Sequence, residues 1–205
     1  MGHSFMKNRI ICGLLFLCLV LMNISLLASN SACNDDVLNE LNLMYEKDQE
    51  ERFKIIDSKN LGSEEAVQIL EQLDQEHLPR LKAIVHQFGW PGYQLVGEEG
   101  ADKMWLLVQH CDRDLEFQKL CLLLLEEAVE KKDAPKRHLA YLVDRVLVNE
   151  GNAQIYGTQF RFADGRAVPY PIEMPHDLDK RREEMGLCPF DEYLSLTIAT
   201  YHLRK

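Results

Sequence analysis

The sequence lacks the short motifs that mark most recognisable catalytic and metal sites. It has no CxxC, HxH or HExxH spacing and no aspartate-rich loop, so it contains no zinc or calcium motif. It also has no P-loop, no dinucleotide-binding glycine pattern and no serine nucleophile elbow. We therefore expect no metal and no cofactor, and whether the protein is an enzyme stays open.

Charge is missing from the apolar segment near the N-terminus. Lys7 and Arg9 precede the uncharged residues 10–22, and small polar residues follow as far as Ala32. A basic start, a short apolar core and a small-residue end are the three parts of a secretory signal. We expect residues 1–32 to be a signal peptide cleaved near Ala32.

Two alternatives remain for this segment. Residues 10–28 approach the length of about 20 that crosses a membrane, which allows an uncleaved signal anchor. Cys33 follows two small residues as in a lipoprotein signal, although Asn30 stands where leucine is usual. The expected location is the periplasm or the medium, with an inner-membrane anchor or lipoprotein as alternatives. Any membrane contact would then run through the N-terminal segment.

Basic residues are scarce relative to acids in the remainder of the chain. Residues 33–205 hold 21 lysines and arginines against 33 acids, a net charge of −12. Such a domain repels nucleic acid. The expected partner is a small molecule, an envelope component or another protein. Four cysteines remain there, and the sequence leaves their pairing open. They are Cys33, Cys111, Cys121 and Cys188.

Hydrophobic periodicity predicts a mostly α fold. Apolar residues at helical spacing indicate a helix over residues 35–57. Ser63 suits the N-cap of the next helix, in which Pro79 is expected to divide or kink the chain. We divide the chain into the signal segment, an N-terminal helix (33–62) and a compact helical domain (63–205). About six or seven helices are expected in all.

The pattern changes late in the chain. Residues 154–162 alternate in the manner of a strand, and Asp164-Gly165 is a strong hairpin turn. A β-hairpin is therefore predicted near residues 154–172. Gly157 suggests a place where something approaches the backbone closely.

Polar residues concentrate around this hairpin and the helix before it. At 100° per residue, His138, Tyr141 and Arg145 fall on one stripe of that helix, and Asp144 lies next to Arg145. The side chains of the following segment extend the cluster as candidate ligand-binding groups. These are Gln154, Tyr156 and Gln159.

A second cluster is His110-Cys111-Asp112, where one helix ends and Asp114 caps the next. A histidine beside an aspartate can serve as a general base with its orienting group. His110 and Asp112 are therefore the candidate catalytic residues.

Several stretches of the chain together form a recognisable pattern. They are Gly89-Trp90-Pro91, Gly97 to Ala101, Trp105 to His110 with Asp112, Phe117-Gln118, Ala140 to Leu142 with Asp144-Arg145, and Gln154 to Gln159. Together they resemble an uncharacterised bacterial family of unknown function, DUF6624. The resemblance implies that the polar positions form a recurring pattern, and it implies no activity. Cys111 departs from the small alanine expected there, which indicates that it is not a required nucleophile or ligand.

Two functions remain open from the sequence. One is a non-catalytic exported domain that binds its partner between the His138 helix and the hairpin. The other is a hydrolase or transferase with His110 as base and Asp112 as its orienting group. Arg145, Gln154 and Gln159 would then hold an anionic or amide-bearing substrate. A single-site enzyme requires the two clusters to meet.

Overall fold

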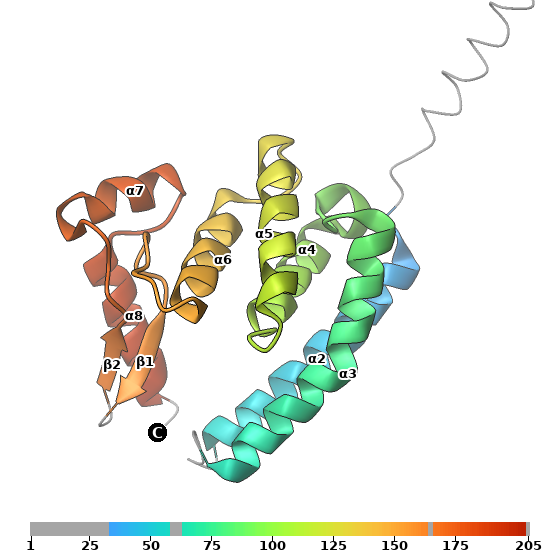
Figure 1. The fold of residues 1–205 in the computed structure, drawn as a ribbon, viewed down its shortest axis with the longest axis horizontal. Coiled ribbons are helices and arrows are strands. Elements are labelled where there is room, and N and C mark those ends of the chain that lie inside the picture. The colour runs from blue at the N-terminus through green and yellow to red at the C-terminus, as the bar shows by residue number, and fades with distance from the viewer. Residues whose placement is uncertain (1–32, 58–62, 164–165, 204–205) are drawn as a thin grey trace, which may run out of the picture. The chain divides into compact units, whose positions relative to one another are not determined.

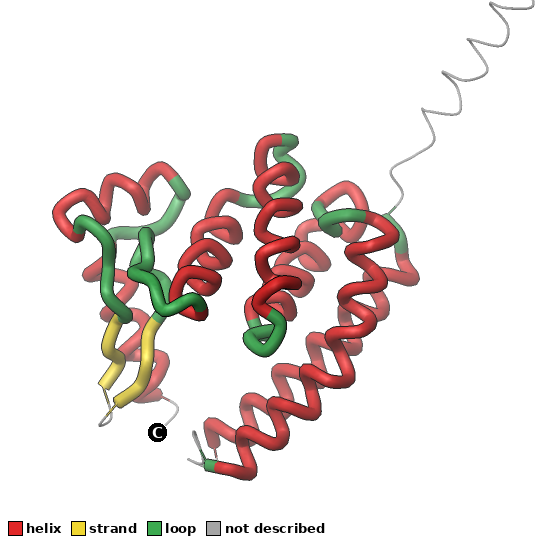
Figure 2. Tube along the Cα trace, in the orientation of Figure 1, coloured by secondary structure: helices red, strands yellow, loops and turns green. Residues whose placement is uncertain are grey.

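The computed structural model describes residues 33–57, 63–163 and 166–203. Within these ranges the chain forms seven α-helices and one antiparallel β-hairpin, which confirms the expected fold class (Figure 1, Figure 2). The expected signal segment lies outside the described residues. None of the described helices is long and apolar enough to cross a membrane. The elements are α2 (Asp35–Asp57), α3 (Glu64–Phe88), α4 (Tyr93–Gln109), α5 (Leu115–Glu130), α6 (Lys136–Asn149), β1 (Phe160–Ala163), β2 (Arg166–Pro169), the 3-10 turn η1 (Pro175–Asp177), α7 (Leu178–Glu184) and α8 (Phe190–Leu203).

The helices share one hydrophobic core. The long helices α2 and α3 lie side by side, and α2 also packs against α4 (Figure 1). Helix α4 contacts α5 and α6, which pack against each other. Each contributes its apolar stripe to the core, as amphipathic helices do. Fully buried members are Leu41, Leu81, Met104, Leu125 and Leu142.

Two helix starts have the capping chemistry predicted from the sequence. Ser63 Oγ accepts a hydrogen bond from the N–H of Ala66 at 3.1 Å, where α3 begins. Asp114 Oδ1 accepts one from the N–H of Phe117 at 2.9 Å, where α5 begins. Each cap satisfies a backbone donor that has no partner within its own helix.

Pro79 was predicted to divide or kink the helix, and it does not divide α3. The helix continues through Pro79 along its whole length. An interior proline removes a backbone hydrogen bond and costs about 3 kcal/mol. Leu73 and Leu81, which precede and follow it, are both buried. Their burial on one helical face offsets the cost of the proline.

The strand predicted for residues 154–162 was too long. β1 begins only at Phe160, which lies opposite Pro169 of β2. Residues 154–159, here called the Asp144 loop, instead form an irregular loop, in which Gln154 makes an isolated bridge to Ile172. Gly157 in this loop has a φ of +67°, which only glycine adopts readily. A Cβ there would lie 2.9 Å from a ring carbon of Phe190, so the close approach suggested by the sequence is that of α8.

A buried carboxylate holds the Asp144 loop. Asp144 Oδ1 accepts hydrogen bonds from the N–H groups of Ile155 and Tyr156 at 2.7 and 3.0 Å. Asp144 Oδ2 accepts from the N–H and the hydroxyl of Thr158, both at 2.9 Å. Burial raises the pKa of Asp144, and the hydrogen bonds oppose that shift. The three backbone N–H groups are donors only, so the ionised carboxylate matches the loop best.

Two arginines of α7 hold the carbonyl side of the same loop. Arg182 is fully buried and donates from Nη1 to the carbonyl oxygen of Tyr156 at 2.6 Å. Its guanidinium lies 4.9 Å from the centre of the Tyr193 ring. Arg181 Nε donates to the carbonyl oxygen of Ile155 at 3.0 Å. The loop backbone is thus bound by a carboxylate through its N–H groups and by guanidinium groups through its carbonyls.

The substitution Asp144→Asn should reduce stability strongly, because the amide presents an NH₂ donor where the loop also presents donors. We expect the free energy of unfolding to fall by about 3 kcal/mol. Urea unfolding followed by circular dichroism measures the change. Glu126→Gln, at an exposed position on α5, is the control and should change it by less than about 0.5 kcal/mol. A small effect at Asp144 would show that the carboxylate does not hold the loop.

Candidate functional site

His110, at the C-terminal end of α4, is paired with a residue that the sequence did not indicate. Its Nδ1 lies 2.9 Å from Oδ2 of Asp48 on α2. Arg52 Nε donates to the other oxygen of Asp48 at 2.9 Å. We expected Asp112 to orient His110, but in the described part of the chain the hydrogen-bond partner of the ring is Asp48. That carboxylate is only 2% exposed, so the two contacts fix it from both sides.

The pair is an ionised acid and a neutral base. Burial alone would raise the pKa of Asp48, but the hydrogen bond from His110 and the charge of Arg52 outweigh it and lower the pKa to about 2. Burial lowers the pKa of His110, and the charges of Arg52 and Arg145 act in the same direction. At pH 7 Nδ1 therefore carries the proton donated to Asp48, and Nε2 is an acceptor.

The acceptor nitrogen of His110, Nε2, has no hydrogen-bond partner among the described residues, and the side chain is partly exposed. Nε2 is also not among the buried polar atoms without a partner there, which are Trp90 Nε1, Gln109 Nε2 and His138 Nδ1. With 18% of the side chain exposed, the ring offers a neutral nitrogen to a small molecule from outside.

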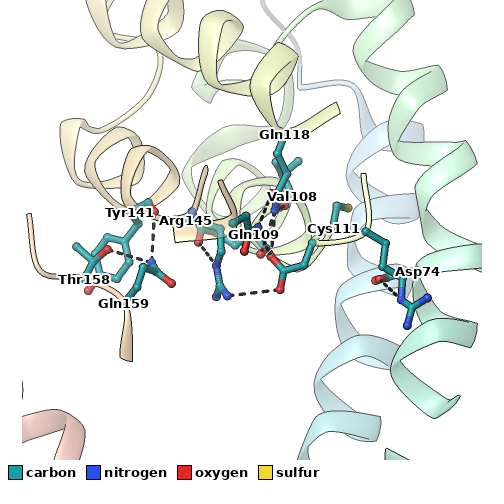
Figure 3. A network of polar contacts seen from close by, with 12 residues as sticks. Asp74, Val108, Gln109, Cys111, Gln118, Tyr141, Arg145, Thr158 and Gln159 are labelled. Atoms are coloured by element: carbon teal, nitrogen blue, oxygen red, sulfur yellow. Dashed lines mark hydrogen bonds and ion pairs between the residues drawn. The ribbon is translucent and has the colours of Figure 1, made fainter. Parts of the chain in front are cut away.

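Asp112 is held by a different set of residues. Asn149 Nδ2 donates to Asp112 Oδ1 at 2.9 Å and to Gln118 Oε1 at 3.0 Å. Gln118 is fully buried and donates to the carbonyl oxygen of Val108 at 3.1 Å. This network ties the last turn of α4 to α5 and α6, and it holds Asp112 beside them. Figure 3 shows Gln118 of α5 beside Val108 and Gln109 of α4.

Arg145 brings the two clusters predicted from the sequence together. Its Nε donates to Gln109 Oε1 at 3.4 Å and its Nη1 to Asp112 Oδ2 at 3.5 Å, as the dashed lines in Figure 3 show. Both contacts are long for hydrogen bonds. Because 29% of the Arg145 side chain is exposed, the guanidinium keeps donors for another partner. We call Arg145, Gln109, Asp112, Asn149 and His110 the Arg145 site.

Gln109 is incompletely satisfied. Its oxygen accepts from Arg145, while its Nε2 is buried and lacks a partner among the described residues. A buried donor without a partner costs about 1–3 kcal/mol. The Arg145 site therefore contains a buried N–H donor that has no acceptor among the described residues.

Acidic groups accumulate on the α3 side of His110. Burial raises the pKa of Asp74 to about 6, with Asp112 and Asp48 adding to the shift and Arg52 and Arg113 opposing it. Arg113 Nε lies 3.9 Å from Asp74 Oδ2. Carboxylates with opposite pKa shifts in one region are common at functional sites.

His138 and Tyr141 lie further back along α6. His138 Nε2 lies 2.9 Å from Asp102 Oδ1, and its ring stacks on Trp105 at 4.4 Å between centroids. Burial lowers the pKa of His138 to about 4. Seven residues separate His138 from Arg145, which is about 10 Å along the helix axis. Tyr141 packs edge-on against Trp105. These two predicted ligand-binding residues thus belong to an aromatic cluster beside the Arg145 site.

The remaining predicted ligand-binding residues organise the Asp144 loop. Gln154 Nε2 donates to the carbonyls of Gln159 and Tyr170 at 3.1 and 3.0 Å, and its oxygen accepts from the N–H of Gln159. Gln159 Nε2 donates to the carbonyl of Tyr141 at 3.3 Å (Figure 3). The N–H and carbonyl of Tyr156 are taken by Asp144 and α7. The amide groups of Gln154 and Gln159 therefore join the loop to itself, to the hairpin and to α6.

Sequence reasoning missed Asp48 and Asp74. Asp48 has Arg52 four residues later, a spacing that indicates an ion pair on a helix surface and nothing more. The four cysteines of the described chain are free thiols, and Cys111 donates to the carbonyl of Leu107 at 3.3 Å. The described residues contain no group of three or more histidines, cysteines or acids that could hold a metal.

The lowered pKa of Asp48 predicts how stability depends on pH. Its ionised form stabilises the fold fully above the unfolded pKa near 4, and this contribution is lost as the pH falls toward 2. The shift corresponds to about 2 kcal/mol of unfolding free energy. Urea unfolding of Asp48→Asn between pH 4 and pH 2 should show a flatter dependence than the wild type. Asp36→Asn, at an exposed position on the same helix, should retain the wild-type slope. Equal slopes for all three proteins would contradict the assignment.

Comparison with known proteins gives one match. The sequence pattern of a family described as "Family of unknown function (DUF6624)" matches residues 35–205, which include every residue of the Arg145 site. No curated protein and no solved structure matches the chain. Because the match covers the whole described fold from α2 onward, the chain belongs to the DUF6624 family of unknown function.

Proposed function

We propose that the domain binds a small molecule carrying an oxyanion, a carboxylate or a phosphate, at the Arg145 site. The observation behind this proposal is the Arg145 guanidinium, which is partly exposed and held by two long contacts beside a buried amide donor without a partner. A guanidinium presents paired donors that match the two oxygens of a carboxylate or phosphate. An incoming oxygen would complete the bonding of Arg145.

Three other arginines of the described chain, Arg182, Arg181 and Arg52, are occupied in a different way. Arg182 is buried against carbonyls and aromatic rings, and Arg181 donates to three backbone carbonyls. Arg52 is committed to Asp48. Arg145 differs because one neutral amide oxygen and one half-exposed carboxylate are its contacts. Its position therefore favours recognition of an added anion over support of the fold.

Asp112 would select among such anions. Its carboxylate is 47% exposed and lies next to Arg145. It repels a ligand that carries further negative charge, and it attracts a hydrogen-bond donor placed beside the oxyanion. The net charge of −12 on residues 33–205 acts in the same direction. The ligand is thus a small molecule with one anionic group, met either free or as part of a larger envelope component.

Loss of the guanidinium should abolish this binding. A thermal-shift screen of the purified protein with lactate, glutamine and inorganic phosphate, each with one anionic group, should find a ligand that raises Tm, and isothermal calorimetry then gives its Kd. Arg145→Ala should weaken that binding at least about tenfold, or about 1.4 kcal/mol. Arg137→Ala is the matched control, since Arg137 lies on the same helix and pairs with Asp102 at the surface. Wild-type affinity in Arg145→Ala would remove Arg145 from the site.

We further propose that residues 1–32 export this domain from the cytoplasm. Support comes from Lys7 and Arg9, the uncharged residues 10–22 and the small residues that end at Ala32. Cell fractionation with mass spectrometry of the N-terminus tests the proposal. A cleaved protein should begin near Cys33 and lie outside the inner membrane, whereas an anchor would retain the segment in the membrane fraction. Full-length protein in the cytoplasm would contradict export.

A further inference from the structure

We infer that His110 is a general base at the Arg145 site, with Asp48 as its positioning residue, and that the ligand is an ester with a free carboxylate which the site hydrolyses. The inference rests on the proposed function, because Arg145 binds the carboxylate of the ester. It extends that function from binding to chemistry.

The first support is the way in which the ring is held. A base must keep one orientation and one tautomer, and a carboxylate on Nδ1 gives both. Asp48 meets this need from the body of the protein: it is buried, fixed by Arg52 and 2.9 Å from His110 Nδ1. The other nitrogen, Nε2, has no hydrogen-bond partner among the described residues, and 18% of the side chain is exposed. A histidine with only a structural role would more often have both nitrogens occupied.

The second support is the place of Arg145. Gln109 and Asp112 flank His110 in the sequence, and both contact the Arg145 guanidinium. Arg145 therefore lies against the same turn that carries His110. A carboxylate bound there has the rest of its molecule within reach of the imidazole, as general-base catalysis requires.

Water is the nucleophile in this scheme. The adjacent thiol, Cys111, is buried, and burial raises its pKa. Water transfers a proton to His110 Nε2 while its oxygen bonds to the acyl carbon. The bond from that carbon to the leaving oxygen then breaks, and the leaving oxygen takes the proton from His110. The products are a carboxylic acid and an alcohol. One imidazole that takes and returns one proton suffices for an ester, whose leaving group departs more readily than an amine.

Charged groups around the ring set its pH dependence. Asp48 and Arg52 face it from α2, and Arg145 faces it from α6. On the α3 side, Asp74 and His77 feel the charge of Asp48. Because burial lowers the pKa of His110, the base is deprotonated over the neutral range. Activity should rise with pH through a midpoint below the ordinary histidine value of about 6.5 and then reach a plateau.

The test compares two chromogenic esters. Mono-p-nitrophenyl succinate carries a free carboxylate and p-nitrophenyl acetate does not. The wild type should hydrolyse the succinate ester with the higher kcat/KM. His110→Gln should lower kcat for both by about 100-fold or more. Arg145→Ala should remove the preference for the succinate ester, because KM for that ester rises by more than KM for the acetate ester. His86→Gln, an exposed histidine on α3, should match the wild type.

Asp48 is tested by its effect on the pH profile. Asp48→Asn should lower kcat at least about tenfold and move the rising limb of the profile, while Asp48→Glu should restore part of the rate. If Asp48→Asn does not fold, the wild type still provides a test. The rate at which diethyl pyrocarbonate modifies His110 shows whether Nε2 is exposed and neutral. A protected His110 overturns the inference.

The two proposals fail in different ways. Binding of a monocarboxylate that depends on Arg145, without ester hydrolysis above the level of His110→Gln, overturns the catalytic inference and leaves the binding function intact. An unchanged rate of ester hydrolysis in His110→Gln also overturns the catalytic inference and leaves the binding function intact. Hydrolysis that depends on His110 but shows no preference for the carboxylate ester, together with no carboxylate binding, overturns the proposed ligand.

Discussion

The direction in which Arg145 points depends on the buried carboxylate of Asp144. It gathers three backbone N–H groups and one hydroxyl of the loop that follows α6, which fixes that helix about its own axis. Arg145 is the next residue and points about 100° away around the helix. With Asp144 turned toward the loop, Arg145 is turned toward the end of α4, where Gln109 and Asp112 receive it. One internal contact thus sets the direction of the one guanidinium on which the proposed site is built.

Polar groups in the two neighbouring regions are satisfied to different degrees. Around Asp144 the donors and acceptors are matched, with α7 supplying the carbonyl partners. Around Arg145 the contacts are long and the amide of Gln109 retains an unpaired donor. A complete network gives rigidity, and an incomplete one beside it leaves hydrogen-bonding capacity for a ligand. This contrast separates residues that support the site from residues that can meet a ligand, although both sets looked alike as polar side chains in the sequence.

The sequence predicted contacts between residues that are close together in the chain. It did not predict the pairing of residues that are far apart in the chain. The caps at Ser63 and Asp114 were predicted because a cap and its helix are adjacent in the chain. His110 was expected to pair with nearby Asp112, whereas its partner Asp48 is 62 residues away, a relation that no spacing records. The alternation after Gln154 resembled a strand because sequence patterns do not show that Asp144 has taken the N–H groups a strand would need. The meeting of Asp112 with Arg145 likewise required the packing of α4 on α6.

The glycine of the Asp144 loop has a consequence for the order of folding. Gly157 lies under the ring of Phe190, and Tyr156 is bound by Arg182, both of which come late in the chain. The loop cannot reach its final conformation until those residues have been synthesised and have docked. A nascent chain that has completed α2 to α6 therefore still holds Asp144 without its full surroundings. The Asp144 loop therefore reaches its native conformation late in folding, after residues from the C-terminal part of the chain have packed against it.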